Sequence, residues 1–465
     1  MAFLVLEGIR SEAPRISSLA NLRSKEHIYV DQDVRTMISA IVSKIGTGVL
    51  ALLGIAALGV ACTSAQAPSP TSTLAPVTVP TERVVVVMKT PTPVVIVVTA
   101  TPTPTKPSAP TSNRVVGGKV GHLAPEFGGI NAWINGGPYT MEELRGQVVL
   151  IDFWTYTCIN CIRTYPFLKQ WHLRYANDGL VIVGVHTPEF EFEKDYENVV
   201  EAIQLNALEW AMAQDNDFIT WRRYNNRFWP AKYLIDKNGV VRYTHWGEGG
   251  YAETEEMIRE LLAEADPSFL ENGLALPQDQ TLDHGFLTAR GAEVTRELYA
   301  GYKRGEADLV FGRGGYVQQP QYYYNKNEVF QFNITEEQEP HKINFQGAWM
   351  IGPESSTHAR KTDSFEDYLA LVYSATSVNA VLTSDSGKPY KVRVTVGDEY
   401  LTEKNKGSDI IIGDDGESYL WVTAPTLYNV IDNESYVRRE KLTMSSNSTD
   451  FVLFAFTFGV YATGP

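Results

Sequence analysis

The chain of 465 residues has little cysteine and no excess of basic side chains. Three cysteines are too few for a framework of disulfides. Lys and Arg number 40 against 55 Asp and Glu, which gives a net charge of −15, and no stripe of basic and aromatic residues occurs. This balance argues against a nucleic-acid-binding protein, which needs a clustered basic face. Hydrophobic residues make up 44% of the chain, which excludes wholesale disorder, and the length suggests two or three domains.

An apolar run of 17 residues, 45–61, lies between Lys44 and Cys62. A basic residue, an apolar stretch and small residues before the cut are typical of a signal peptide. The run ends in L-G-V-A-C and resembles the lipobox of bacterial lipoproteins, although Gly59 stands where a large apolar residue is usual. The resemblance implies a signal peptide over 37–62 and lipidation of Cys62. The alternative is an uncleaved membrane anchor, and both place the remainder outside the cytoplasm.

Two segments on either side of this run lack a core-forming pattern. Residues 1–36 are mixed in charge, and Met37 begins a segment that suits a basic leader, so we expect 1–36 to be an extension ahead of the native start. Residues 63–113 are rich in Pro, Thr and Val. Their prolines favour extended polyproline II structure, so we expect a linker that holds the following domains away from a membrane.

The chain from 114 to 268 alternates strand-like and helix-like patterns. The runs 148–153 and 180–185 are continuously apolar, as buried strands are, and a helix-like stretch extends from 158 to 175. A further pair of strand-like runs flanks an Asn-Gly turn. Strands that alternate with helices predict an α/β domain in which helices cover a sheet.

Cys158 and Cys161 form a C-x-x-C motif where the first of these strands gives way to the helix. At a helix N-terminus, unpaired N–H groups and the helix dipole favour the thiolate, which is the nucleophile in thiol–disulfide exchange. The second cysteine lies one turn further on and can attack a mixed disulfide within the same molecule. The motif therefore predicts a redox-active dithiol that needs no other cofactor.

Three other uses of the motif are weaker. A zinc site needs four ligands, and the chain has no second cysteine pair or H-x-x-H motif, so we expect no metal. A structural disulfide that closes a four-residue loop gains little entropy. A peroxidatic cysteine in the P-x-x-x-T-x-x-C pattern would have proline at the position of Ile151, although Thr155 fits that pattern.

The segment I-D-F-W-T-Y-T-C-I-N-C resembles the active site of thioredoxin. Asp152 and Trp154 stand six and four residues before Cys158, as they do in thioredoxins, and Trp154 would pack beside the cysteines. Pro166 stands where a proline bends the thioredoxin active-site helix. The resemblance also implies that Pro230, in the run W-P-A-K-Y-L-I-D, is a cis-proline that lies against the cysteines.

The roles of the site residues follow from this resemblance. Cys158 would be the exposed nucleophile and Cys161 the resolving thiol. Asp152 would be a buried carboxylate with a raised pKa that takes the proton from Cys161 through a water; the alternative is a buried acid with a local hydrogen bond. Trp229 and Pro230 would offer backbone groups to a substrate strand.

A closer resemblance is to the TlpA-like branch of the thioredoxin family and to the periplasmic part of DipZ-type proteins. It rests on W-T-Y-T-C-I-N-C-I-R-T-Y-P at 154–166, G-V-H-T-P-E-F at 184–190, R-F-W-P-A-K-Y-L-I-D at 227–236 and Y-T-H-W-G-E-G at 243–249. The resemblance implies disulfide-bearing substrate proteins and a separate membrane electron donor of the CcdA/DsbD kind. Ile159 and Asn160 replace the Gly-Pro of thioredoxin and would contact substrate, and TlpA-like relatives mostly act as reductants.

The C-terminal third has short strand-like runs separated by turn signals. We expect a connecting region over 269–324 and an all-β sandwich, jelly-roll-like, of about eight strands over 325–465. This part resembles the carbohydrate-binding-like module of DipZ-type proteins in the runs V-T-R-E-L-Y-A-G-Y, Q-G-A-W, L-Y-N-V-I and F-A-F-T-F-G. The resemblance implies a glycan or partner ligand held by exposed aromatics such as Trp349, Trp421 or Tyr322–Tyr324, while core packing of these aromatics is the alternative.

Together these features predict an extracytoplasmic, membrane-anchored thiol–disulfide oxidoreductase that reduces protein disulfides through Cys158 and Cys161. A disulfide-forming oxidase is the alternative within the same chemistry, because the motif does not fix the direction of electron flow. A surface glycan-binding or adhesion lipoprotein with a passive disulfide is the alternative from another class. Exchange at Cys158 separates these two classes.

Overall fold

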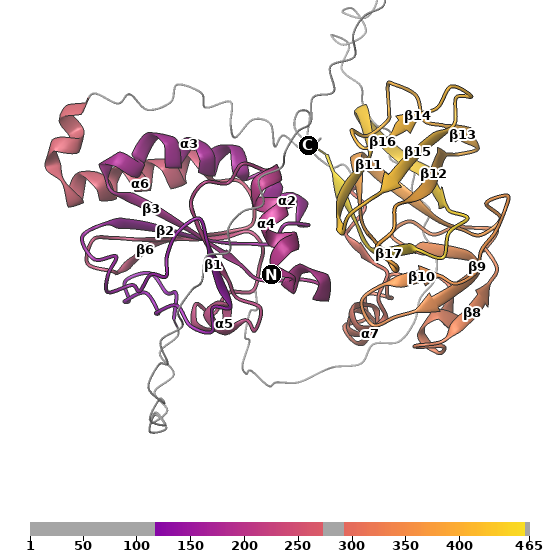
Figure 1. The fold of residues 1–465 in the computed structure, drawn as a ribbon, viewed down its shortest axis with the longest axis horizontal. Helices are drawn as coiled ribbons and strands as arrows, with labels where there is room; N and C mark the ends of the chain where they lie inside the picture. Colours follow the sequence, from indigo (N-terminus) through magenta and orange to yellow (C-terminus); the bar gives the residue numbers. More distant parts are fainter. Residues whose placement is uncertain (1–116, 273–292, 461–465) are drawn as a thin grey trace, which may run out of the picture. The chain divides into compact units, whose positions relative to one another are not determined.

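A computed structural model describes residues 117–272 and 293–460, which contain two folded domains of different class (Figure 1). The predictions for residues 1–113, including the signal peptide, the lipidation of Cys62 and the linker, lie outside the described residues. Within the two described ranges, no helix is both long enough and apolar enough to cross a membrane.

The first domain has the predicted α/β fold, with a six-stranded sheet in the order β1–β4–β3–β2–β5–β6. Strands β2, β3 and β4 are parallel, and β1, β5 and β6 run antiparallel to their neighbours. The strands are β1 (Ala132–Ile134), β2 (Val148–Trp154), β3 (Leu180–His186), β4 (Ala211–Gln214), β5 (Ala231–Ile235) and β6 (Val241–Trp246). The α-helices are α2 (Ile159–Ile162), α3 (Tyr165–Tyr175), α4 (Tyr196–Leu205), α5 (Ile219–Arg223) and α6 (Tyr251–Ala265). Short 3-10 turns are η1 (Ala176–Asp178), η2 (Glu191–Lys194) and η3 (Pro267–Asn272).

Strand β2 is apolar except for Asp152, because helices cover both faces of the sheet. Successive side chains of a strand point to opposite faces. On one face, helices α3, α4 and α6 pack against Val148, Leu150 and Trp154. On the other face, the side that holds α5, lie Val149, Ile151 and Phe153. Asp152 therefore lies on the same face as the first group, which is also the face that contains Cys161.

The helix that the sequence predicts from 158 to 175 is interrupted. Helix α2 ends at Ile162 and α3 begins at Tyr165, with Pro166 at the second position of α3. Pro166 has no N–H to donate to the carbonyl of Ile162, four residues earlier, so a continuous helix is broken here. The hydroxyl of Thr164 donates to the carbonyl of Cys161 at 2.7 Å, which satisfies one acceptor at the break.

The second domain is all-β, as predicted, and its antiparallel strands join in one 11-stranded sheet. The order is β14–β15–β12–β16–β11–β17–β10–β9–β8, with β13 beside β12 and β7 beside β17. The first strands are β7 (Leu298–Tyr299), β8 (Val329–Phe332), β9 (Ile343–Ile351), β10 (Ser356–His358) and β11 (Tyr368–Ser384). The later strands are β12 (Tyr390–Val396), β13 (Glu399–Tyr400), β14 (Ile411–Ile412), β15 (Ser418–Val422), β16 (Thr426–Ser445) and β17 (Phe451–Gly459). Helix α7 (Tyr302–Val310) and the 3-10 turn η5 (Pro320–Tyr323) complete the domain.

Strand β11 closes this sheet around its core because it changes partners along its length. Residues 368–371 pair with β9 and residues 377–384 pair with β17, while β16 pairs with both parts. Register shifts on both sides of Ala375 mark the change of partner, and such bulges bend a strand. The enclosed core is rich in aliphatic and aromatic side chains, Trp349 among them.

This domain begins before residue 325, where the sequence analysis places its boundary. Strand β7 pairs with β17, and Leu298 and Tyr322 are buried in the core of the domain. A large part of the predicted connecting region 269–324 therefore belongs to the β domain. The strand in this region has only two residues, which is too short to leave a recognisable alternating pattern.

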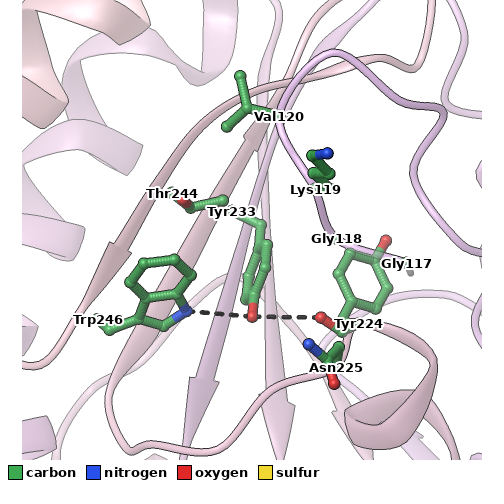
Figure 2. A pocket seen from close by; sticks show the side chains of 9 residues that line it. All are labelled: Gly117, Gly118, Lys119, Val120, Tyr224, Asn225, Tyr233, Thr244 and Trp246. Atoms are coloured by element: carbon green, nitrogen blue, oxygen red, sulfur yellow. Dashed lines mark hydrogen bonds between the residues drawn. The ribbon is translucent and has the colours of Figure 1, made fainter. Parts of the chain in front are cut away.

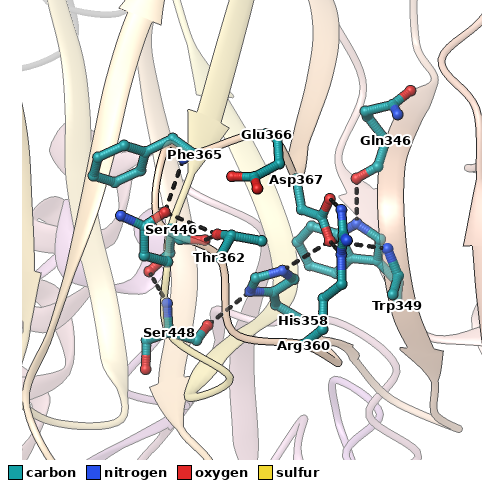
Figure 3. Close-up of polar contacts among 12 residues, drawn as sticks. Gln346, Trp349, His358, Arg360, Thr362, Phe365, Glu366, Asp367, Ser446 and Ser448 are labelled. Atoms are coloured by element: carbon teal, nitrogen blue, oxygen red, sulfur yellow. Dashed lines mark hydrogen bonds and ion pairs between the residues drawn. The ribbon is translucent and has the colours of Figure 1, made fainter.

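A buried polar cluster fixes one loop of the β domain (Figure 3). Asp367 accepts two hydrogen bonds from Arg360, at 2.7 and 2.6 Å, and one from the backbone N–H of Ala348 at 3.1 Å. His358 lies with its Nε2 3.1 Å from Asp367 and its Nδ1 2.8 Å from the carbonyl oxygen of Ser448. Burial alone would raise the pKa of Asp367, but the bonds from Arg360, Ala348 and His358 hold it below its ordinary value. The members satisfy one another, so the cluster serves the fold.

Candidate active site

Cys158 caps the N-terminus of α2. Its backbone is extended (φ −81°, ψ 108°), and its Sγ accepts the backbone N–H of Cys161 at 3.3 Å. The Cys158 side chain is partly exposed and borders a pocket that Asn160, Phe228 and Trp229 also line. Cys158 is therefore placed to attack a disulfide that approaches from outside the domain.

Cys161 belongs to α2 and is fully buried in the core. Burial raises the pKa of its thiol well above the ordinary value, and the hydrogen bond and charge of Cys158 raise it further. Cys161 therefore stays protonated at neutral pH and needs a base before it can act as a nucleophile.

Asp152 lies directly across from Lys232 on the neighbouring strand β5. The Nζ of Lys232 is 3.6 Å from Oδ1 of Asp152, and both side chains are almost completely buried. Burial raises the pKa of Asp152 to about 6, although the charge and hydrogen bonding of Lys232 lower it. The charge of Asp152 also raises the pKa of Cys161, so the two groups are electrostatic neighbours. A buried carboxyl group with a pKa of about 6 thus lies near the thiol of Cys161.

The Trp229–Pro230 peptide bond is cis. Trp229 is fixed by its Nε1, which donates to the carbonyl of Thr187 at 3.0 Å, and by Trp221, whose ring centroid lies 4.4 Å away. The carbonyl of Pro230 accepts the backbone N–H of Gly247 at 2.8 Å. This segment leads into β5 and lines the same pocket as Cys158.

The remaining predicted residues lie around the cysteines in different ways. Ile159 is buried, whereas Asn160 is half-buried and accepts a weak hydrogen bond from Arg163 at 3.4 Å. Trp154 is buried, with its ring edge-on to Tyr165 at a centroid distance of 6.0 Å. These positions favour Asn160 over Ile159 as a side chain that meets a substrate.

Two charged residues of the site are absent from the sequence prediction. Lys232 is the buried partner of Asp152, and a lysine inside an otherwise apolar strand, A-K-Y-L-I, was the available signal. Glu193 is also fully buried, and its carboxylate accepts the hydroxyl of Thr157 at 2.6 Å, next to Cys158. No sequence pattern links Glu193 to the motif, because Glu193 and Thr157, which precedes the motif, are 36 residues apart.

A second pocket of this domain, of about 320 Å³, carries no thiol or carboxyl side chain (Figure 2). Tyr224, Tyr233 and Trp246 provide its aromatic walls, with Lys119 and Asn225 at its polar rim. The indole of Trp246 donates to the hydroxyl of Tyr233 at 3.4 Å, which in turn donates to the carbonyl of Tyr224 at 3.4 Å. Thiol chemistry therefore belongs to the Cys158 site. Across residues 117–272 and 293–460, no group of three or more His, Cys, Asp or Glu could hold a metal ion.

The aromatics proposed for ligand binding in the β domain divide into two groups. Trp349 and Tyr322 are buried in the core, so they cannot stack on a ligand. Trp421 and Tyr324 are 46% and 82% exposed. Tyr323 is half-buried and packs against the core, so Trp421 and Tyr324 are the exposed members of the aromatics named from the sequence.

Two family models match separate parts of the chain. Residues 120–244 match the AhpC/TSA family, and residues 295–459 match the family described as thioredoxin like C-terminal domain. The thiol-disulfide oxidoreductase YkuV of Bacillus subtilis is 31% identical over 143 residues, which are 30% of this chain and 95% of YkuV. Nearly the whole of that relative is thus represented here. The chain belongs to the thioredoxin-like thiol–disulfide oxidoreductase family.

Other similar proteins are longer than the matched part of this chain or match less than half of it. Protein DipZ of Mycobacterium tuberculosis is 43% identical over 195 residues, which are 41% of this chain and 27% of DipZ. The chain therefore spans about a quarter of the length of that relative. A solution structure of a thioredoxin-like protein in its oxidised form matches with 31% identity, covering 30% of this chain and 95% of the other, at a TM-score of 0.29.

Proposed function

We propose that this protein reduces disulfides of other proteins outside the cytoplasm through the Cys158–Cys161 dithiol. The observation that carries the proposal is the hydrogen bond from the N–H of Cys161 to the Sγ of a partly exposed Cys158, above a buried Cys161. One sulfur is stabilised as the attacking thiolate, and the other is kept protonated until it is needed.

The exchange has two steps with balanced atoms and electrons. The Cys158 thiolate attacks one sulfur of the substrate disulfide, forms a mixed disulfide and expels the other substrate sulfur as a thiolate. Cys161 then gives its proton to the Asp152 carboxylate through a water, attacks the Sγ of Cys158 and expels the second substrate thiolate. The substrate gains two electrons and the protein is left with a Cys158–Cys161 disulfide. The pocket lined by Asn160 and Trp229 is where we expect the substrate strand to lie.

The same proposal includes an anchor and an electron supply. Cys62 follows an apolar run of signal-peptide type, so we propose that lipidation at Cys62 ties the protein to a membrane. The oxidised pair must be reset by a dithiol donor, and a membrane protein of the CcdA/DsbD kind suits a reductant on that side of the membrane.

The test is catalysis of protein disulfide reduction with dithiothreitol as the electron source. The full chain should accelerate the reduction of an insulin-type interchain disulfide, and Cys158→Ser should lose this acceleration by on the order of 10³-fold, because no other thiol of the site is exposed. Cys62→Ser is the matched control and should keep the full rate. Equal rates with the unaltered protein and with Cys158→Ser would reject the proposed function.

A further inference from the structure

Glu193 is a buried carboxyl that the two-step exchange does not use. It belongs to the short turn η2, which follows β3, and it is fully buried. Glu191, two residues earlier in the same turn, has a side chain that is 73% exposed. Buried acids are rare unless they are paired or hydrogen-bonded. The burial of Glu193 therefore requires hydrogen-bond partners for its carboxyl oxygens.

All the partners of Glu193 are hydrogen-bond donors. Its Oε2 accepts the backbone N–H of Glu189 at 2.5 Å and that of Phe190 at 3.0 Å. Its Oε1 accepts the hydroxyl of Thr157 at 2.6 Å. Three donors and no acceptor match an ionised carboxylate, which accepts at both oxygens.

A local role in capping η2 accounts for only one of these oxygens. The N–H groups of Glu189 and Phe190 belong to the start of the turn that contains Glu193 itself. The bond to Thr157 instead spans 36 residues and joins η2 to the segment between β2 and α2. Thr157 is buried and directly precedes Cys158, so this bond fixes the backbone that leads into the nucleophile.

Glu193 and the dithiol share a buried neighbour, Tyr165. Burial raises the pKa of Tyr165 well above its ordinary value, and the charges of Cys161, Cys158, Asp152 and Glu193 all add to that rise. The pKa of the buried Tyr165 is thus affected by both cysteines and by both acids. Burial likewise raises the pKa of Glu193 to about 7, with the charge of Glu189 adding, while bonds from Thr157, Thr155 and Phe190 oppose the rise.

Several other titratable groups near Glu193 are acidic or neutral. Burial raises the pKa of Tyr156, and the charges of Glu193, Asp195 and Glu201 add to the rise, so Asp195 and Glu201 are further negative charges near this ring. His186, at the end of β3, is fully buried, and burial lowers its pKa to about 3, so it is neutral. A negative charge on Glu193 is therefore not cancelled by a neighbouring cation among these groups.

We propose that Glu193 is a positioning residue of the redox site, which holds Thr157 and thereby Cys158, and whose buried charge makes the dithiol more strongly reducing. The inference rests on the proposed function and extends it. A negative charge close to a thiolate disfavours the reduced form of the pair, and a pair whose reduced form is less stable is the stronger reductant. The hydrogen bond to Thr157 supplies the geometry, and the carboxylate supplies the electrostatic effect.

The experiment compares Glu193→Gln with Glu191→Gln in the full chain. Each protein is equilibrated with dithiothreitol buffers, and the thiol state of Cys158 and Cys161 is read by mass after alkylation. Glu193→Gln should shift the exchange equilibrium three- to tenfold towards the dithiol, which is up to about 30 mV because a tenfold change is 29.6 mV for a two-electron couple. It should also lower the pH at which the alkylation rate of Cys158 is half maximal. Glu191→Gln should change neither quantity by more than about 1.5-fold, since its charge is exposed and screened.

Thr157→Val distinguishes the effect of the Thr157–Glu193 hydrogen bond from the effect of the Glu193 charge. It also provides a second test if Glu193→Gln does not fold. It keeps the carboxylate but removes the donor, so the alkylation rate of Cys158 at pH 7 should change at least twofold, while the equilibrium shift stays smaller than that of Glu193→Gln. A Glu193→Gln protein that melts earlier but keeps the equilibrium and the pH profile of the unaltered chain would reduce Glu193 to a structural cap. An unaltered chain that never exchanges would instead reject the proposed function itself.

Discussion

Replacing Cys161 with serine is expected to stop the exchange at the mixed disulfide. The Cys161→Ser protein keeps the Cys158 thiolate and its access to substrate, but it has no second sulfur to release the product. Multiple turnover should fall on the order of 10³-fold or more, and the chain should gain the mass of one substrate molecule. Non-reducing electrophoresis and intact mass measure the adduct, and peptide mapping should place it on Cys158.

The matched control for this trap is the double variant Cys158→Ser with Cys161→Ser. It should form no adduct, because the only cysteine left in the sequence, Cys62, lies far along the chain from the site. An adduct on Cys62 in either variant, or none at all with Cys161→Ser, would contradict the assignment of Cys158 as the attacking sulfur.

The second large effect is expected for Asp152→Asn, and it depends on pH. The pKa of Asp152 is raised to about 6, chiefly by burial, so the unaltered protein should release product faster as the pH rises through about 6 and the carboxylate forms. Asp152→Asn cannot accept the proton of Cys161, so the release step should slow by roughly 10²-fold and lose this inflection. The rate at which substrate leaves the mixed disulfide in a single turnover, measured between pH 5 and 8, reports both effects.

Asp217→Asn is the control for the loss of one carboxylate from this domain, because Asp217 is exposed. It should keep both the release rate and the inflection. A pH profile of Asp152→Asn identical to that of the unaltered protein would show that another group takes the proton from Cys161.

The raised pKa of Asp152, which is paired with Lys232, also makes the free energy of unfolding depend on pH. The folded protein holds the Asp152 proton up to about pH 6, whereas the ordinary value of the pKa is 3.8. The free energy of unfolding contributed by this group therefore falls as the pH rises from about 4 to 6, by about 3 kcal/mol for a shift of about two units. Asp152→Asn should lack this dependence, although it leaves Lys232 without its partner.

Sequence reasoning located the dithiol because its chemistry is encoded locally. The turn from strand to helix, the spacing of Cys158 and Cys161, and Pro166 all lie within one short segment. The break between α2 and α3 shows the limit of that reasoning, since proline chemistry predicts a bend but not whether the helix ends. Strand β4 was missed because its four residues are too few for a periodic signal.

The contacts that tune the site were not predictable in the same way. Lys232 meets Asp152 only because β5 pairs antiparallel with β2 in one register. Glu193 contacts Thr157 only because η2 lies close to the segment that follows β2. Such pairings depend on tertiary structure, which local patterns do not specify.

The β domain illustrates the same limit at a larger scale. Strand β11 reads as two runs in the sequence, because bulges around Ala375 interrupt its alternation, and the structure joins them in one strand of 17 residues. Strand β16 was not predicted, since many of its residues, such as Asn433 and Glu434, are polar and its exposure does not alternate. Pairing with β11 along its length holds it in the sheet despite this composition.

The measurement that tests the central claim most directly is the reduction potential of the Cys158–Cys161 pair in the full chain. The protein is equilibrated in thiol–disulfide buffers of stepped potential, alkylated, digested, and the peptide that contains both cysteines is weighed, so that Cys62 does not interfere. A reversible two-electron transition near or below about −270 mV is the predicted result, as a reductant requires. A transition near about −120 mV would make the protein a disulfide-forming oxidant, and no transition at any potential would contradict a redox function altogether.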